Sequence, residues 1–402
     1  MPPPRLSQPE FIALMAMLFA TIAFSIDAML PALPEIAAEL TPEDVNRAQL
    51  IVTSFVFGMG FGTLLAGPLS DSFGRKPVIV AGAILYCAAA ALAWAAQSLE
   101  LALIARVVQG IGAAGPRVVA IAMVRDLYVG RHMARIMSLV FLIFALVPAI
   151  APSLGALIIH FAGWRAIFAA FIGFAVFSVG WMMIRQAETL PVAARRPLSM
   201  RSVAGNVAEV LRDRVVRLSI LAQTMSFATL FATLSSTQPV FDVTFNQAET
   251  FHLWFAAIAV LASSASAINA RLVVRLGMRR MVRAVLTGQI LISAVFLLVS
   301  WVGWPEALHL WAYFLWVTSV FFMAGMTLGN LNAIAMEPMG HIAGTAASVV
   351  GSLSTMGSVL LAVPIGLMFN GTPIPGVAGV LVLCIGALWV MKILGSRGEA
   401  PA

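Results

Sequence analysis

Long apolar stretches alternate with short polar ones along the whole chain. Each apolar stretch has about 20 residues or more, the length that an α-helix needs to cross the hydrocarbon core of a membrane. A backbone in lipid must satisfy its polar groups within helices or a closed barrel, and these stretches are too long and too uniformly apolar for barrel strands. The pattern therefore predicts an all-α membrane protein with twelve transmembrane helices, at residues 11–33, 48–69, 77–97, 101–124, 135–160, 165–184, 216–238, 251–273, 282–302, 309–333, 342–368 and 375–394.

The longest polar stretch divides six of these spans from the other six. It covers residues 185–215 and contains Pro191, Pro197 and several arginines. A degenerate copy of the segment Gly67–Pro77 recurs about half a chain later, at Asn269–Arg280. Two similar halves are typical of transporters built from internal repeats. The predicted organisation is an N-terminal six-helix bundle (1–184), a cytoplasmic linker (185–215) and a C-terminal six-helix bundle (216–402).

Composition and charge support the membrane assignment and predict its orientation. Hydrophobic residues make up 61% of the 402 residues and charged residues only 10%, against about 45–50% and about 25% in soluble domains. The net charge is +7, but the bases cluster at alternate span ends, as the positive-inside rule describes. Only Arg47 and Arg165 lie at the opposite ends. We therefore expect both termini in the cytoplasm, and the positive charge gives no reason to expect a nucleic-acid partner.

Asp27 is the strongest candidate for a functional residue because it lies inside the first span. An acid at such a position is costly and therefore indicates a function. Pro31, four residues further on, cannot donate a hydrogen bond to the carbonyl group of Asp27, so the helix should open locally beside the carboxyl group. The alternative is a hydrated carboxylate near the outer interface with no role.

Arg106 and Gln109 lie in the fourth span, with Gly110 and Gly112 beside them. At 1.5 Å per residue, Asp27 is about 7 Å and Arg106 about 9 Å outward of the middle of its span, so the two side chains could meet in one layer. An unpaired buried charge is expensive, which favours an ion pair between them. We predict that Asp27 and Arg106 form an ion pair with a function. The alternative is a static ion pair that holds two helices together.

A second charged group lies where the second span meets the third. Arg75, in the segment Gly67–Pro77, could pair with Asp126 at the inner end of the fourth span, and breaking this contact would open the cytoplasmic side. The alternative is that these charges only set topology. The predicted gating loop consists of Gly67, Asp71, Gly74, Arg75, Lys76 and Asp126.

The fifth span carries Pro148, Pro152 and Gly155 on one helical stripe. Prolines bend helices, so this span should be kinked and should offer a thin face on which the two halves can rock. An ordinary proline kink is the alternative.

No set of residues identifies the substrate. Arg117 comes eleven residues after Arg106, close to three helical turns, so it shares the face of Arg106. It could attract an anionic group, or it could be a structural base. The residues assigned to a substrate cavity are Arg117, Gln109, Phe24, Gln223, Phe227 and Asn330, and each also has a simple packing explanation.

Metal, redox and catalytic motifs are not indicated. Cys87 and Cys384 fall inside apolar runs, where cysteines behave as small core residues. The five histidines are scattered near span ends, and neither HExxH nor GxSxG occurs. We expect a protein that is not an enzyme and has no cofactor.

These motifs resemble those of the major facilitator superfamily. Gly67–Pro77 is similar to its signature G-x-L-x-D-R-x-G-R-K, with Ser72 in place of the first Arg. Arg106–Gly112 resembles R-x-x-Q-G-x-G, which is linked to proton coupling in that family, and Pro148–Gly155 resembles an exporter motif without its leading glycine. Asp27–Pro34 resembles D-x-x-L-P-A-L-P of the Bcr/CflA branch of drug:proton antiporters.

The resemblance implies a function. It implies a monomeric, proton-coupled exporter of small amphipathic molecules such as antibiotics, which works by alternating access in the bacterial inner membrane. Protonation of Asp27 would weaken its hold on Arg106. The alternatives are a symporter or a metabolite exporter of the same fold, or a sensor that no longer transports.

Overall fold

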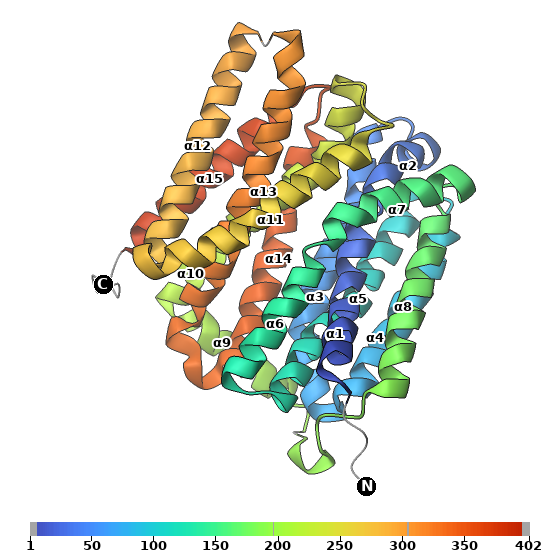
Figure 1. Ribbon diagram of the computed structural model, residues 1–402, viewed down its shortest axis with the longest axis vertical. Coiled ribbons are helices and arrows are strands. Elements are labelled where there is room, and N and C mark those ends of the chain that lie inside the picture. Colours follow the sequence, from blue (N-terminus) through green and yellow to red (C-terminus); the bar gives the residue numbers. More distant parts are fainter. Residues whose placement is uncertain (1–5, 196, 304, 396–402) are drawn as a thin grey trace. The chain divides into compact units, whose positions relative to one another are not determined.

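The computed structural model describes residues 6–195, 197–303 and 305–395 (Figure 1). Every regular element in these residues is helical, and twelve of the described helices are long and apolar enough to cross a membrane. The predicted fold class is therefore confirmed. The chain forms two compact units, which we describe one at a time.

Unit 1 comprises residues Met1–Thr41 and Ser54–Ala204. Its first helix packs against α5, α6, α7 and α8 and is largely surrounded by protein. The elements are α1 (Gln8–Asp27), η1 (Leu30–Ala32), α2 (Leu33–Leu40), most of α3 (Leu50–Phe73), α4 (Arg75–Trp94), α5 (Leu99–Leu127), α6 (Gly130–Phe144), α7 (Val147–Ala162), α8 (Ala166–Arg185), η3 (Val192–Ala194) and the start of α9 (Met200–Arg212).

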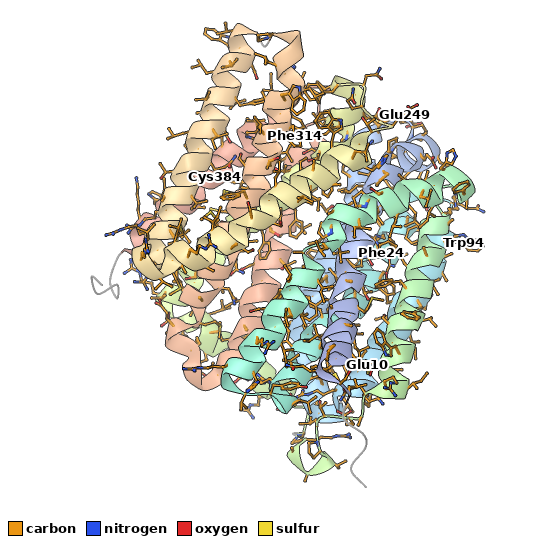
Figure 2. The ribbon with its side chains drawn as sticks, in the orientation of Figure 1. Glu10, Phe24, Trp94, Glu249, Phe314 and Cys384 are labelled. Atoms are coloured by element: carbon orange, nitrogen blue, oxygen red, sulfur yellow. The ribbon has the colours of Figure 1, made fainter. Side chains whose placement is uncertain are left out.

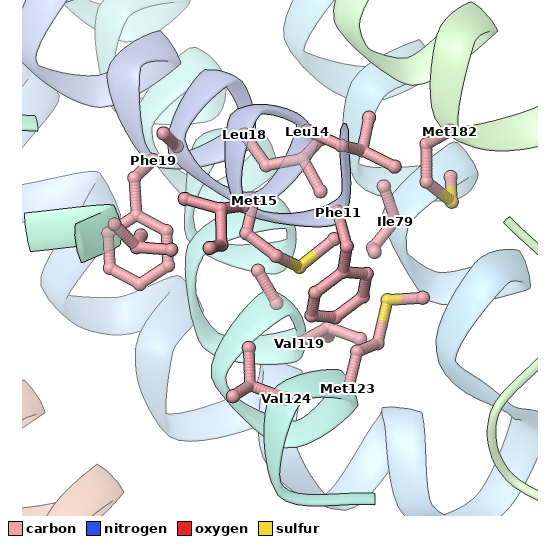
Figure 3. Close-up of a cluster of buried hydrophobic side chains, with 14 of the residues drawn as sticks. Phe11, Leu14, Met15, Leu18, Phe19, Ile79, Val119, Met123, Val124 and Met182 are labelled. Atoms are coloured by element: carbon pink, nitrogen blue, oxygen red, sulfur yellow. The ribbon is translucent and has the colours of Figure 1, made fainter. Parts of the chain in front are cut away.

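An apolar cluster joins the first half of α1 to its neighbours (Figure 3). Close packing gives these helices a defined arrangement, because dispersion contacts and not the hydrophobic effect drive helix association in lipid. The labelled members are Phe11, Leu14, Met15, Leu18 and Phe19 of α1, Ile79 of α4, Val119, Met123 and Val124 of α5, and Met182 of α8.

Two spans of unit 1 are broken where the sequence predicts it. The helix α1 ends at Asp27, and the chain continues through the short turn η1, which contains Pro31. Figure 2 marks Glu10 and Phe24, which lie near the two ends of α1. The fifth span is interrupted at residues 145–146, between α6 and α7, and Pro148 occupies the first turn of α7. The predicted kink is therefore present.

The connection between α3 and α4 is shorter than the sequence predicts. We expected a loop over Gly67–Pro77, but α3 continues through Pro68 to Phe73, and Gly74 alone makes the turn. The φ angle of Gly74 is +103°, which favours glycine. Ser72 Oγ donates to the carbonyl oxygen of Pro68 over 3.0 Å, so its hydroxyl group is satisfied within the last turn of α3.

Unit 2 comprises residues Pro42–Thr53 and Gly205–Ala402. The first segment groups with this unit because Asn46 Nδ2 donates to the carbonyl oxygen of Phe369 over 2.7 Å. Around α10 pack α13, α14 and α15. The elements are η2 (Val45–Gln49), α10 (Arg214–Pro239), the π-helical turn η4 (Val240–Thr244), α11 (Phe251–Leu276), α12 (Met278–Val302), α13 (Glu306–Met336), η5 (Glu337–Ile342), α14 (Ala343–Leu367) and α15 (Ile374–Leu394).

Glycines allow α5 to touch both of its neighbours in unit 1. A Cβ atom on Gly62 of α3 would lie 2.6 Å from the carbonyl oxygen of Ile111, and a Cβ atom on Gly112 would lie 2.6 Å from the carbonyl oxygen of Gly82 on α4. Small residues are the usual means by which transmembrane helices approach so closely. The backbones of α3, α4 and α5 therefore form one tightly packed group.

This packing predicts the effect of adding one methyl group. Gly62→Ala should destabilise the protein by roughly 1–3 kcal/mol, because backbone atoms must shift to admit the Cβ atom. The thermal midpoint of the purified protein in detergent measures the change. Gly173→Ala on α8 is the matched control, because a Cβ atom there meets nothing within 4 Å. Equal midpoints for the two variants would contradict the close approach.

Candidate functional site

Arg106 lies in a polar layer inside unit 1. Its side chain is 0% exposed. Nη1 donates to Gln109 Oε1 over 2.8 Å, and Nη2 donates to the carbonyl oxygen of Ser25 over 2.9 Å. The guanidinium group also lies over the ring of Phe55, 4.3 Å from its centroid, where a cation–π attraction applies. The charge is thus held by a carbonyl dipole, an amide oxygen and an aromatic face.

Ser25 links this layer to α4. Its Oγ atom lies 2.6 Å from the hydroxyl oxygen of Tyr86 and 2.6 Å from the carbonyl oxygen of Thr21, to which it donates. Tyr86 is 1% exposed. Buried hydroxyl groups need such partners, because an unsatisfied polar group in an apolar environment is costly. The layer therefore ties α1, α4 and α5 together through side chains that satisfy one another.

Asp27 is close to this layer but is not bonded to it. Asp27 is 6% exposed, and its carboxyl group forms no hydrogen bond or ion pair with any residue in the described part of the chain. The expected ion pair with Arg106 is not formed here. The physical reason is that Arg106 is already satisfied by the carbonyl group of Ser25, two residues before Asp27, and by Gln109.

The motif of the fifth span meets α1 beside Asp27. A Cβ atom on Gly155 would clash with the carbonyl oxygen of Ala28, the residue that follows Asp27. Pro152 and Gly155 are buried on α7, and Pro148 is half-buried. Thus the thin face of α7 packs where α1 ends, next to the unpartnered carboxyl group.

Arg75 is the centre of a second cluster, at the α3–α4 turn of unit 1. Its side chain is 3% exposed. Nε donates to Asp126 Oδ2 over 2.9 Å, and Nη1 donates to Ser70 Oγ over 2.8 Å and to Asp71 Oδ1. The predicted Arg75–Asp126 ion pair is present, and it joins the start of α4 to the end of α5. Gly67 lies one helical turn before Asp71 on α3.

The linker that follows α8 completes this cluster. Glu188 Oε1 accepts from the backbone N–H of Arg75, and Oε2 accepts from that of Lys76, both over 3.0 Å. Free N–H groups at a helix start favour a negative charge, so Glu188 caps α4. Lys76 Nζ donates to the carbonyl oxygen of Met183 over 3.0 Å. The linker is therefore bound to the turn.

Unit 2 repeats part of this arrangement. Gly277, with φ +77°, precedes α12 as Gly74 precedes α4. Arg279 Nη2 donates to Glu337 Oε2 over 2.7 Å, at the end of α13. The sequence copy in this half has no acid of its own, and Glu337 on another helix supplies the partner.

The residues assigned to the substrate cavity divide between the units. In unit 1, Gln109 binds Arg106, and the ring of Phe24 packs edge-on against Phe171 at 5.3 Å. Arg117 Nη1 lies 3.9 Å from Met59 Sδ. In unit 2, Gln223 is buried, Phe227 stacks on Phe231, and Asn330 Nδ2 donates to Asn269 Oδ1 over 2.8 Å.

Three residues that take part in these two polar clusters are not identified by the sequence analysis. Tyr86 could have been noticed, because the chain has only three tyrosines and this one lies inside an apolar span. Ser25 acts through its backbone carbonyl group as well as its hydroxyl group, and no local pattern signals such a role. Glu188 lies in a polar linker among other charges, where nothing marks it as a helix cap.

Comparisons with known proteins place the chain in a family. Residues 13–362 match the Major Facilitator Superfamily. The bicyclomycin resistance protein homolog of Haemophilus influenzae is 30% identical over 390 residues, which cover 96% of this chain and 94% of that protein. The chloramphenicol resistance protein of Pseudomonas aeruginosa is 30% identical over 402 residues, which cover 94% of this chain and 89% of that protein.

A solved structure shows the same fold. The D-xylose-proton symporter aligns with a TM-score of 0.73 at 15% sequence identity, and the match covers 94% of this chain and 97% of that chain. At this identity the match shows the fold alone. The resemblance read from the motifs is confirmed by the sequence matches, and the chain belongs to the Major Facilitator Superfamily.

Proposed function

We propose that the protein is a proton-coupled exporter of small amphipathic molecules, antibiotics among them. A multi-pass transporter fold and relatives named for drug resistance support this reading. We further propose that it acts as a monomer in the bacterial inner membrane, with both termini in the cytoplasm, because the bases gather at alternate span ends.

The observation that carries the proposal is the buried carboxyl group of Asp27. It has no bonding partner among the described residues and lies where α1 ends, beside Gly155 of α7. An ionised carboxylate in an apolar environment is costly, and proton binding removes that cost. A group that can exchange its charge at a helix break is suited to link proton binding to movement.

In this mechanism Arg106 has two bonding partners, one for each charge state of Asp27. When Asp27 is neutral, the guanidinium group binds the carbonyl oxygen of Ser25, as in the contacts described above. When Asp27 is ionised, the same group exchanges that carbonyl oxygen for the carboxylate, because charge-assisted hydrogen bonds are the stronger ones. The exchange moves α1 against the thin face of α7, and this biases alternating access. Each charge moved across the membrane contributes about 2.3 kcal/mol per 100 mV.

The cluster around Arg75 is proposed as the cytoplasmic gate of unit 1. The Arg75 side chain is buried and bonds to Asp126, Asp71 and Ser70, so releasing it requires several bonds to break together. Breaking a buried ion pair is costly. Gating by this cluster would therefore be cooperative.

A proton symporter of the same fold is the main competing function. It would share the fold and the coupling residues, and would differ only in the direction in which the substrate moves. The direction is measured in everted membrane vesicles with an imposed pH gradient. Chloramphenicol is a suitable probe, because a relative is named for resistance to it. An exporter predicts release of vesicle protons when chloramphenicol is added.

Asp27→Asn should abolish chloramphenicol-driven proton release, because the amide cannot exchange a proton. Recovery of acridine-dye fluorescence in everted vesicles measures the release. Glu10→Gln is the control, because Glu10 lies on the same helix and is paired with Arg185 over 2.7 Å. This variant should keep the release. Unchanged proton release in Asp27→Asn would remove Asp27 from the coupling mechanism.

The Arg75–Asp126 contact should be visible as an energetic coupling. Arg75→Gln and Asp126→Asn should each lower the thermal midpoint and the transport rate, and the double variant should lose less than the sum. The expected coupling is about 0.5–3 kcal/mol, as for residues in direct contact. Arg131→Gln, which removes an exposed charge, is the control. Additive effects of the two substitutions would contradict a shared gate.

A further inference from the structure

Arg117 is a cation in the fourth span for which the described residues supply no counter-charge. It is half-buried on α5, and none of the ion pairs formed by the described residues includes it. Its Nη1 atom lies 3.9 Å from Met59 Sδ. A guanidinium group has five N–H donors, and a thioether sulfur is only a weak acceptor. The charge of Arg117 is therefore barely compensated.

The contact with Met59 places this charge near the middle of the membrane. Met59 is the central residue of the second span, Val45–Phe73. The hydrocarbon core is about 30 Å thick, so lipid phosphates lie about 15 Å away from its middle. A lipid headgroup is thus a poor candidate for the missing anion. A charged side chain at this depth is by default a functional one.

Protein carboxylates are also distant along the helices that hold Arg117. On α3, Asp71 comes twelve residues after Met59, about 18 Å at 1.5 Å per residue. On α5, Asp126 comes nine residues after Arg117, about 14 Å away, and it is bonded to Arg75. Between Arg117 and Asp126, Val119 and Met123 of α5 belong to the apolar cluster shown in Figure 3.

A second guanidinium group, that of Arg106, lies on the same helix as Arg117. Arg106 lies over the ring of Phe55, and Arg117 contacts Met59, four residues further along α3. Four residues correspond to about 6 Å along a helix. Arg106 and Arg117 themselves are eleven residues apart on α5, about 16 Å along the axis, so Arg106 adds positive charge to the same helix and offers no compensation to Arg117.

We propose that Arg117 is the anion-binding residue of the transport site, and that carboxylate-bearing amphipathic molecules are among the substrates. This inference rests on the proposed export function but concerns the chemistry of the cargo. The fork of N–H donors on Arg117 matches a carboxylate, which accepts two parallel hydrogen bonds.

Two ligands of similar shape and different charge test the proposal. 1-Naphthoate is ionised at neutral pH, and 1-naphthamide is not. Binding of each is measured by equilibrium dialysis with the full-length protein in nanodiscs of zwitterionic lipid, with empty nanodiscs subtracted. The wild-type protein should bind naphthoate about tenfold more tightly than naphthamide, which corresponds to about 1.4 kcal/mol. Equal affinities would overturn the proposal.

Two substitutions assign the preference to Arg117. Arg117→Gln should reduce it to near unity, whereas Arg117→Lys should retain part of it and shows that the site still folds. Arg131→Gln removes the same charge from an exposed position and should leave the preference intact. A preference that survives Arg117→Gln, or that Arg131→Gln removes equally, would contradict an anion site at Arg117.

Binding in nanodiscs and proton release in everted vesicles are separate readouts, and together they separate this inference from the export function. A naphthoate preference that depends on Arg117 supports the anion site, even in a protein that shows no chloramphenicol-driven proton release. The lack of chloramphenicol-driven proton release would count against the proposed export function and not against the anion site.

Discussion

A charge inside the hydrocarbon core must be compensated, and this requirement organises unit 1. Arg106 is fully buried, and it is compensated by the carbonyl group of Ser25, the amide oxygen of Gln109 and the ring of Phe55. These partners come from three helices, so α1, α3 and α5 cannot separate without exposing the charge. Losing one partner of a buried charged group is strongly destabilising. The polar layer therefore restricts how these helices can move.

Glycines and helix breaks make this arrangement geometrically possible. Gly62 and Gly112 bring α3 and α4 against α5, and Gly155 brings α7 against the end of α1. In lipid, such contacts supply the attraction that burial supplies in water. Because α1 ends at Asp27, the least compensated carboxyl group of this region lies at the point where the chain can change direction. Close packing and a helix break thus occur side by side.

The sequence predicts the fold well and the contacts unevenly. Twelve apolar stretches of spanning length, and prolines at Pro31 and Pro148, are enough to predict the helices and two of their breaks, because these depend on local hydrophobicity and backbone chemistry. The Arg75–Asp126 pair also follows from the positions of the two charges at span ends. The bonding partner of Arg106 cannot be predicted in this way. The depth of a residue along its helix gives the layer in which the side chain lies. It does not give the direction of the side chain, or whether it binds a carboxylate or a carbonyl group. The same limit hides Glu188, whose role depends on how the linker returns to the start of α4.

The central claim is that Asp27 exchanges a proton and that Arg106 responds by exchanging its partner. Infrared difference spectroscopy of the protein in lipid, recorded across a pH titration, measures the first event directly. The account predicts a carbonyl-stretching band of a protonated carboxyl group that disappears as the pH rises, that is absent from Asp27→Asn, and that shifts in Arg106→Lys. Identical pH-dependent carboxyl bands in the wild-type protein and in Asp27→Asn would contradict the account.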